Sequence, residues 1–254
     1  MSEEQDRLFA NGQAAPGSFR FDAKVARVFD DMIRRSVPGY ANTVASSGWL
    51  AARFAQPGTA CHDLGCSLGA TLLACAEALA DTGMEGVELI GVDNSAAMLE
   101  RCRSRLEPEL GSRLPTLIAA DVRTVELRPS SVIILNWTLQ FLPAADRTPL
   151  LARIHEALLP GGALILSEKV IDSDPEAQQL AESLHADFKR TQGYTDLEIA
   201  AKRTAIEDYL IPETLDAQKT RLLELGFRPV LVWYRHLNFA SLLALKPVSL
   251  EHCR

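Results

Sequence analysis

The chain has 254 residues, 47% of them hydrophobic and 23% charged, which excludes a disordered or collagen-like protein and fits one α/β domain. Its 33 acidic and 26 basic residues give a formal net charge of −7, which disfavours binding to the phosphate backbone of nucleic acids. No apolar run approaches the roughly 20 residues that span a bilayer, and an acidic N-terminus with five cysteines lacking paired spacing predicts a cytoplasmic protein with reduced thiols.

The first predicted elements are helical. Residues 1–18 are polar and are expected to form a flexible arm before a single domain over residues 19–254. Asp22 is the predicted N-cap of a helix that ends near Pro38, because apolar residues recur every three or four positions between them. A second helix with similar spacing is predicted to run to Gln56.

From residue 59 onward, short apolar runs alternate with helical patterns. Such alternation is typical of a mostly parallel sheet that is covered by helices on both faces and wound right-handed. A helix over residues 213–225 and two β-rich runs at 229–234 and 239–245 predict an antiparallel hairpin at the sheet edge. The other strands are predicted at residues 59–64, 87–92, 116–119, 132–135 and 163–166, and the other helices at residues 70–80, 96–106 and 148–159.

The segment from about residue 172 to residue 211 interrupts this alternation. It is polar and helical, and Thr195-Asp-Leu-Glu198 is a capping-box pattern that opens a helix through Arg203. An insertion after the carboxyl end of a strand lies where open α/β sheets bind ligands. The segment is therefore expected to act as a helical lid.

The most informative stretch is the loop Cys61-His-Asp-Leu-Gly-Cys-Ser-Leu-Gly69, between a predicted strand and a predicted helix. Gly65 and Gly69 lack a Cβ, so the backbone there can turn tightly and approach a ligand. The N-terminus of the following helix offers free N–H groups and the positive end of a dipole. The loop therefore suits a ligand that carries a carboxylate or a phosphate.

Acidic and amide side chains follow the next strands. Asp93 ends the second strand, where an acid accepts hydrogen bonds from both hydroxyls of a ribose. Asp121 follows the third strand and could accept from an adenine amino group, and Asn136 closes the fourth strand. Each residue alone is typical of a cap or a turn. With the glycine loop after the first strand, these three residues place polar groups at four successive strand ends, which together predict a nucleoside site.

Three interpretations compete for the glycine loop. Dinucleotide binding requires G-x-G-x-x-G or A, and the match is partial because Ser67 replaces the second glycine. The same stretch spells G-x-S-x-G, the nucleophile elbow of α/β hydrolases, but that elbow follows several strands and residues 1–60 read as helical. The third interpretation is the S-adenosylmethionine pocket of seven-stranded methyltransferases. Asp63, Gly65, Gly69 and Asp93 fit it, with Ser67 as the one departure.

The predicted fold class is therefore α/β: a Rossmann-like seven-stranded methyltransferase fold. Its sheet is expected to be mostly parallel, with an antiparallel C-terminal hairpin and a helical lid insertion. The Pro160-Gly161-Gly162 turn before the fifth strand also fits this fold.

Further motifs extend the likeness over roughly residues 18–247, the lid included. Ser67, a departure from the general pattern, is the residue expected within the family that these motifs indicate. The chain closely resembles the carboxy-S-adenosyl-L-methionine synthase family in Val-Pro-Gly-Tyr40, Val-Asp-Asn-Ser95, Leu-Asn-Trp-Thr-Leu-Gln-Phe141, Leu-Ser-Glu-Lys169, His-Ala-Asp-Phe-Lys-Arg190 and Gly-Tyr-Thr-Asp-Leu-Glu-Ile-Ala-Ala-Lys-Arg203.

The resemblance implies an unusual reaction. The family converts S-adenosyl-L-methionine and prephenate to carboxy-S-adenosyl-L-methionine and phenylpyruvate, and the product later serves a separate enzyme that carboxymethylates a wobble uridine in tRNA. Prephenate gains aromaticity as it loses carbon dioxide and hydroxide, the hydroxide takes a proton from the sulfonium methyl, and the resulting ylide captures the carbon dioxide. Such a site must hold additional anions and exclude bulk water.

The resemblance also assigns residues. It places Arg203 at the carboxyl group, where a guanidinium holds a carboxylate by two parallel hydrogen bonds. It places Tyr40 against the cofactor, and Cys66, Asn94 and Val122 in the pocket lining, mainly through backbone groups. A homodimer is likewise implied. The histidines show no ligand spacing, so no metal is expected.

Three other functions stay open when the residues are considered without the resemblance. A plain small-molecule methyltransferase would use the same nucleoside pocket but needs a general base beside an acceptor atom, and no such base stands out. A non-catalytic module would bind the nucleoside without turnover. A serine hydrolase that uses Ser67 is a more distant alternative.

Overall fold

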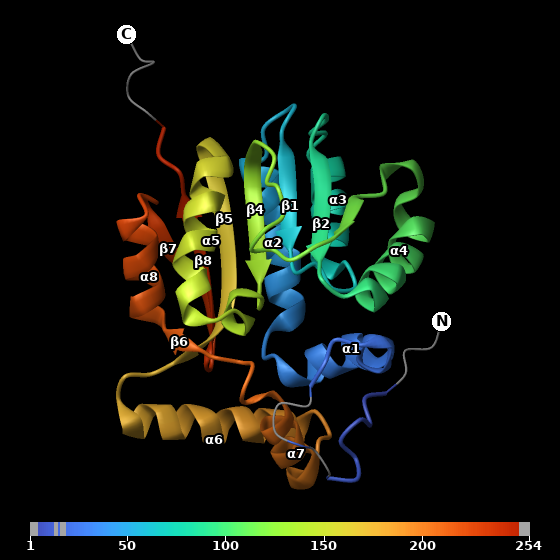
Figure 1. Ribbon diagram of the computed structural model, residues 1–254, viewed down its shortest axis with the longest axis vertical. Coiled ribbons are helices and arrows are strands. Elements are labelled where there is room, and N and C mark those ends of the chain that lie inside the picture. Colours follow the sequence, from blue (N-terminus) through green and yellow to red (C-terminus); the bar gives the residue numbers. More distant parts are fainter. Residues whose placement is uncertain (1–4, 13–14, 16–18, 249–254) are drawn as a thin grey trace.

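The computed structural model describes residues 5–12, 15 and 19–248 and shows an open sheet with helices on both faces (Figure 1). Within this part of the chain the strands pair in the order β3-β2-β1-β4-β5-β8-β7, with the short β6 beside β5. The strands are β1 (Ala60–Leu64), β2 (Glu88–Asp93), β3 (Thr116–Ala119), β4 (Ser130–Asn136), β5 (Leu158–Ile171), β6 (Glu213–Thr214), β7 (Val230–His236) and β8 (Phe239–Leu245).

The pairing confirms the predicted fold class. Strands β1 to β5 are parallel, and β8 is antiparallel to both β5 and β7, as expected for the C-terminal hairpin. The chain builds the sheet outward in one direction from β1 to β3 and then in the other from β4. A sheet that reverses between β1 and β4 opens a crevice at their carboxyl ends, where this fold class binds ligands.

Two apolar layers hold the helices onto the sheet. Alternate residues of the central strands point to opposite faces, so Ile134 and Ile165 pack with α2, α3 and α4, whereas Ile133 and Leu164 pack with α5 and α8. These five helices are α2 (Tyr40–Phe54), α3 (Ala70–Asp81), α4 (Ala96–Leu110), α5 (Ala144–Ala157) and α8 (Leu215–Glu224). Two 3-10 turns, η1 (Gly111–Arg113) and η2 (Leu139–Phe141), follow α4 and β4.

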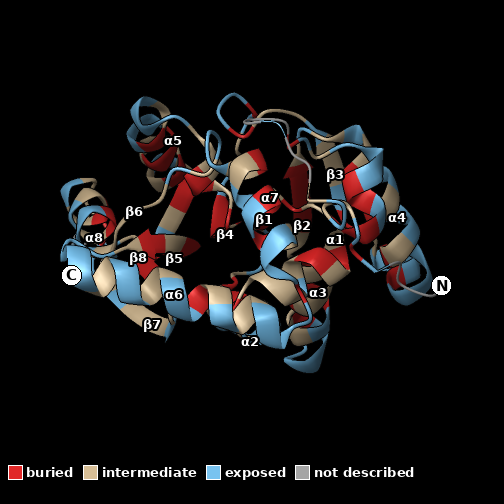
Figure 2. Ribbon diagram, turned by 90° about the horizontal axis from the view of Figure 1, so that it is seen from below, coloured by how far each residue is buried: buried red, intermediate tan, exposed pale blue. Residues whose placement is uncertain are grey.

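Three further helices lie across the carboxyl ends of the strands, as the views from the side and from below show (Figures 1 and 2). They are α1 (Ala23–Ser36), α6 (Pro175–Thr191) and α7 (Asp196–Ile206). Asp22 caps α1 as predicted, accepting hydrogen bonds from the N–H groups of Lys24 and Val25. The predicted capping box of α7 is also present, with Thr195 and Glu198 bonded reciprocally.

The predicted lid segment, residues 172–211, consists of α6, α7 and their connections. Its two ends meet, because β6 pairs with the last residues of β5, Val170 with Glu213 and Ile171 with Thr214. The helix predicted from residue 213 therefore begins two residues later, with Thr214 as its N-cap. Pairing with β5 takes these two residues out of the helix.

Strand β5 is longer than predicted. The predicted strand covered residues 163–166, but pairing with β8 continues through the polar residues Ser167, Glu168 and Lys169. Pro160-Gly161-Gly162 lies inside the strand rather than before it, beside a shift in the register with β4. Hydrogen bonding between strands thus extends β5 where composition alone suggests a loop.

Part of the predicted flexible arm is packed against the domain. Asp6 is only 2% exposed, its N–H donates to Asp31 of α1 (2.7 Å), and its carboxylate accepts from the hydroxyl of Tyr194 (2.6 Å). The ammonium of Lys202 lies 3.7 Å from the same carboxylate. A buried ion pair thus fixes a polar stretch that has no helical pattern. Residues 1–4, 13–14 and 16–18 of the predicted arm lie outside the described residues.

No helix in the described ranges is both long enough and apolar enough to cross a membrane.

Candidate functional site

The glycine loop connects β1 to α3 and turns through left-handed backbone conformations. Gly65 has φ +86°, and a Cβ at this position would lie 2.1 Å from the Oγ1 atom of Thr138, which follows β4. Gly69 has φ +77° and is the N-cap of α3, and no side chain caps this helix N-terminus. The loop thus places uncapped N–H groups at the carboxyl end of β1, where they suit an anionic group.

Ser67 and Asp93 are joined directly. Ser67 has φ +50°, a conformation that favours glycine and explains why the general pattern has glycine here. Its N–H donates to Asp93 Oδ2 (2.9 Å), and the N–H of Ser95 donates to Oδ1 (2.8 Å). These two bonds anchor the carboxylate at the end of β2 and leave further lone pairs for hydroxyl donors such as those of a ribose. Asn94 beside it is exposed.

Asp63, the acid at the start of the motif, is buried at the end of β1. Its Oδ2 atom has no hydrogen-bond partner among the described residues. Burial, followed by the nearby charge of Asp93, raises the pKa of Asp63 to about 7. A buried carboxylate oxygen without a donor is unusual, so a cationic ligand group that donates to it would be strongly favoured. The thiol of the neighbouring Cys66 is also buried, and a hydrogen bond with Cys102 raises its pKa.

Asn136 and an aromatic pair complete the edge at β4. The amide of Asn136 donates to the hydroxyls of Ser47 and Thr71 (both 3.2 Å), while its buried Oδ1 has no partner among the described residues. Trp137 follows with φ +57°, and its ring lies 5.3 Å from that of Tyr40, which is 8% exposed. Tyr40 and Trp137 cluster with Phe239. Trp137 was not predicted as a site residue, because in a sequence it reads as core.

Asp121 and Val122 follow β3, next to the end of β2. The N–H of Ala120 bonds to the carbonyl of Asp93 (3.1 Å), which brings the ends of β2 and β3 together. Val122 is buried, but the carboxylate of Asp121 is held by the guanidinium of Arg123 (2.6 Å), and this hydrogen bond lowers its pKa. An adenine amino group would therefore share that carboxylate with Arg123.

Arg203 is the predicted site residue that stands apart. Its side chain is 61% exposed on α7, and its Nη2 atom lies 3.8 Å from Glu182 Oε2 of α6, so this ion pair joins the two lid helices. Its positive charge nevertheless lowers the pKa of Lys169 at the end of β5, after the larger effect of burial. Arg203 is therefore within electrostatic range of the sheet edge.

Glu168 and Lys169 belong to the motif Leu-Ser-Glu-Lys169, and the sequence alone predicts no role for either residue. Glu168 is fully buried and accepts a hydrogen bond from the N–H of Leu139 (3.0 Å), which holds the turn after β4, and burial raises its pKa to about 8. Lys169 follows on the opposite face of β5. In the sequence, both are charged residues that follow an apolar run. Only the extended pairing of β5 with β8 shows that they lie within the strand.

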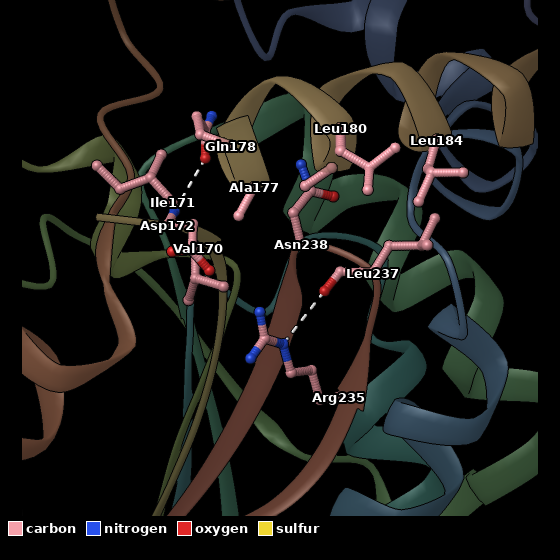
Figure 3. A pocket seen from close by; sticks show the side chains of 11 residues that line it. Val170, Ile171, Asp172, Ala177, Gln178, Leu180, Leu184, Arg235, Leu237 and Asn238 are labelled. Carbon is pink, nitrogen blue, oxygen red and sulfur yellow. Dashed lines mark hydrogen bonds between the residues drawn. The ribbon is translucent and has the colours of Figure 1, made fainter. Parts of the chain in front are cut away.

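A separate cavity of about 220 Å³ lies between α6 and the turn that joins β7 to β8 (Figure 3). Apolar side chains of α6, among them Leu180 and Leu184, line it together with Arg235 and Asn238. None of the predicted cofactor residues lines this cavity. Within the described ranges, no three His, Cys, Asp or Glu side chains are grouped so as to hold a metal ion.

Comparison with known proteins agrees with this geometry. A family model described as "Methyltransferase domain" matches residues 62–162. Carboxy-S-adenosyl-L-methionine synthase of Photobacterium profundum is 48% identical over 95% of this chain and 98% of its own length, and that of Pseudomonas entomophila is 50% identical over 96% and 100%. An O-methyltransferase family protein from Burkholderia thailandensis shares the fold, with a TM-score of 0.63 at 18% identity over 98% of this chain and 64% of its own.

Proposed function

The chain belongs to the carboxy-S-adenosyl-L-methionine synthase family, and on this premise we propose that it converts S-adenosyl-L-methionine and prephenate to carboxy-S-adenosyl-L-methionine and phenylpyruvate. The observation that carries the proposal is the 50% identity along nearly the whole chain, lid included, whereas the Burkholderia thailandensis protein that shares the fold is only 18% identical. The product would supply the carboxymethyl group for modification of a tRNA wobble uridine by another enzyme.

In the proposed complex, S-adenosyl-L-methionine lies across the carboxyl ends of β1, β2 and β4. Asp93 accepts from the ribose hydroxyls, supported by its two backbone N–H bonds. Asp63 receives the ammonium of the methionine part on its unpartnered oxygen, and the uncapped N-terminus of α3 receives the carboxylate. The adenine ring lies against Val122, and its amino group donates to Asp121.

The sulfonium end points toward Asn136 and the aromatic rings of Tyr40 and Trp137. Aromatic faces attract a cation and exclude water, which suits a sulfonium that is to lose a methyl proton. Burial raises the pKa of Tyr40, so its hydroxyl stays neutral and adds no charge beside the ylide. Water excluded from this space cannot reprotonate the ylide before it captures carbon dioxide.

We propose that residues 172–211 act as a lid of the single domain, with Arg203 as the cation for the new carboxyl group. Arg203 is exposed and lies 3.8 Å from Glu182, a contact that a carboxylate ligand could replace by rotation of the side chain. The supporting observation is that α6 and α7 lie across the strand ends (Figure 1).

We further propose a cytoplasmic homodimer. The four cysteines in the described ranges are buried and free, as in a reducing compartment. Leu180 and Leu184 are 60% and 42% exposed beside the cavity of Figure 3. Asp172 and Arg235 line the same cavity, so the surface carries both charges and is compatible with a two-fold, self-complementary contact between identical chains. Sedimentation should give a dimer for the wild type and a monomer for Leu184→Glu; a monomeric wild type would refute the proposal.

Incubation of the purified protein with S-adenosyl-L-methionine and prephenate tests the reaction. Mass spectrometry should detect a sulfonium product that is heavier by one carboxyl group, together with phenylpyruvate. Asp93→Ala is the control, because it removes the ribose contact and should abolish both. Formation of S-adenosylhomocysteine with an acceptor molecule would instead indicate a methyltransferase. No product from protein that binds S-adenosyl-L-methionine would refute the proposal.

A further inference from the structure

Lys169 lies at the carboxyl end of β5, on the same face of the sheet as the proposed sulfonium position. Side chains of β4 and β5 alternate between faces, so Asn136, its β5 partner Ser167, and Lys169 all point toward the α2 side. Across the antiparallel ladder Lys169 is paired with Phe239, which belongs to the aromatic cluster of Tyr40 and Trp137. The ammonium of Lys169 thus belongs to the wall of the same site.

Lys189 approaches this wall from the lid. It is four residues after His185 on α6, and residues spaced by four share one face of a helix. The His185 ring lies 5.2 Å from the Phe239 ring, in an edge-to-face arrangement. Phe239 is therefore the common neighbour of the strand that carries Lys169 and of the helix face that carries Lys189. Burial and then the charge of Lys202 lower the pKa of Lys189, and the charges of Lys169 and Arg203 lower it further. Arg203 also lowers the pKa of Lys169, after the larger effect of burial, so Lys169 and Arg203 lie within electrostatic range of each other and of Lys189.

The charges around this space do not balance. Glu182 on α6 lies 3.8 Å from Arg203, and its negative charge raises the pKa of Lys169. Lys202 is occupied elsewhere, by Asp6 and by the hydroxyl of Ser36 (2.8 Å). His185 is bonded to the carbonyl of Ser36 (2.8 Å), and burial keeps it neutral by lowering its pKa to about 3. When Lys169, Lys189 and Arg203 are all protonated, they outnumber Glu182 by two charges. Burial and the neighbouring cations lower the pKa of Lys189 to about 7, so this excess is unfavourable without an anion.

We propose that Lys169 and Lys189, with Arg203, form the docking site for the two carboxylates of the second substrate. This inference rests on the proposed function, in which that substrate is the dianion prephenate. A dianion would neutralise the excess of two charges, whereas a monocarboxylate would leave one of them uncompensated. Burial is the main cause of the lowered pKa of both lysines. A dianion that pairs with them would raise both pKa values again.

The test uses Lys169→Met and Lys189→Met, which keep the apolar stem and remove the charge. Each variant should raise the KM for prephenate about tenfold or more, the factor that 1.4 kcal/mol of lost binding represents. The dissociation constant of S-adenosyl-L-methionine, measured by calorimetry, should stay within about twofold because Asp93 and Asp63 are untouched. Lys219→Met on α8, which packs against the opposite face of the sheet, is the matched control and should change neither value. Lys169→Arg should recover part of the loss.

Two outcomes separate this inference from the proposed function. If the wild type makes the product and both lysine variants keep its KM for prephenate, the docking site is wrong and the function stands. If the wild type makes no product, direct calorimetric binding of prephenate still tests the site. Binding that weakens in both lysine variants would support a dianion site, and binding that does not weaken would overturn it.

Discussion

The replacement Gly65→Ala tests the tight contact between the glycine loop and the turn after β4. A left-handed conformation costs an L-residue roughly 1–2 kcal/mol. A Cβ at Gly65, where φ is +86°, would also lie 2.1 Å from Oγ1 and 2.8 Å from Cγ2 of Thr138. Overpacking of this kind costs about 1–3 kcal/mol. The free energy of unfolding should therefore fall by about 2–5 kcal/mol, measured by urea titration.

Gly58→Ala provides the matched control. Gly58 has φ +75°, but a Cβ there would meet nothing within 4 Å, so only the conformational cost of about 1–2 kcal/mol applies. Adding Thr138→Ala to Gly65→Ala removes both overlapping side-chain atoms and should recover about 1 kcal/mol or more. Affinity for S-adenosyl-L-methionine should fall in Gly65→Ala and not in Gly58→Ala. Equal destabilisation by the two single replacements would refute the argument from close contact.

Three further predictions follow from buried or capped groups. Asp6→Ala leaves the ammonium of Lys202, 7% exposed, without its carboxylate and should lower the free energy of unfolding by about 3–5 kcal/mol; adding Lys202→Met should recover most of the loss, and a loss below 1 kcal/mol would contradict the ion pair. Asp63 has a folded-state pKa of about 7 against 3.8 when unperturbed, so the folded state holds the extra proton and stability should fall as pH rises from about 4 to about 7. Asp63→Asn should remove that part of the decline in the free energy of unfolding, measured by urea titration at pH 5 to 8. If the wild type and the variant lost stability in parallel, Asp63 would not titrate in this window. Thr195→Ala removes the capping box of α7 and should cost about 1 kcal/mol in thermal unfolding, whereas an unchanged melting temperature would mean that tertiary contacts alone hold the helix.

The sequence predicted the order and type of the main elements because the apolar pattern changes its period where strands give way to helices. It also predicted which residues gather at the strand ends: Gly65, Asp93 and Asn136 lie at the carboxyl ends of neighbouring strands because parallel strands end on one side. That these residues bind S-adenosyl-L-methionine stays a prediction. The role of Arg203 also stays a prediction, and its exposure could not be read from the sequence.

The features that the sequence did not predict depend on contacts between distant residues. The packing of Asp6 depends on Lys202, almost two hundred residues away, and no local pattern signals a buried ion pair between such positions. The polar end of β5 becomes a strand only because β8 is aligned beside it. In the sequence, Lys169 follows the predicted strand and is expected in a loop. In the structure it is paired with Phe239 and lies in the wall of the proposed site.

The ladder between β5 and β6 ties the start and the finish of the inserted helices to one point. Residues 172 to 212 leave the sheet and return to it within the spacing of a single strand pair. A gain or loss of residues in this excursion would therefore leave the alignment of the sheet unchanged. The length of the segment that carries α6 and α7 is in this way independent of the register of the strands that carry Gly65, Asp93 and Asn136.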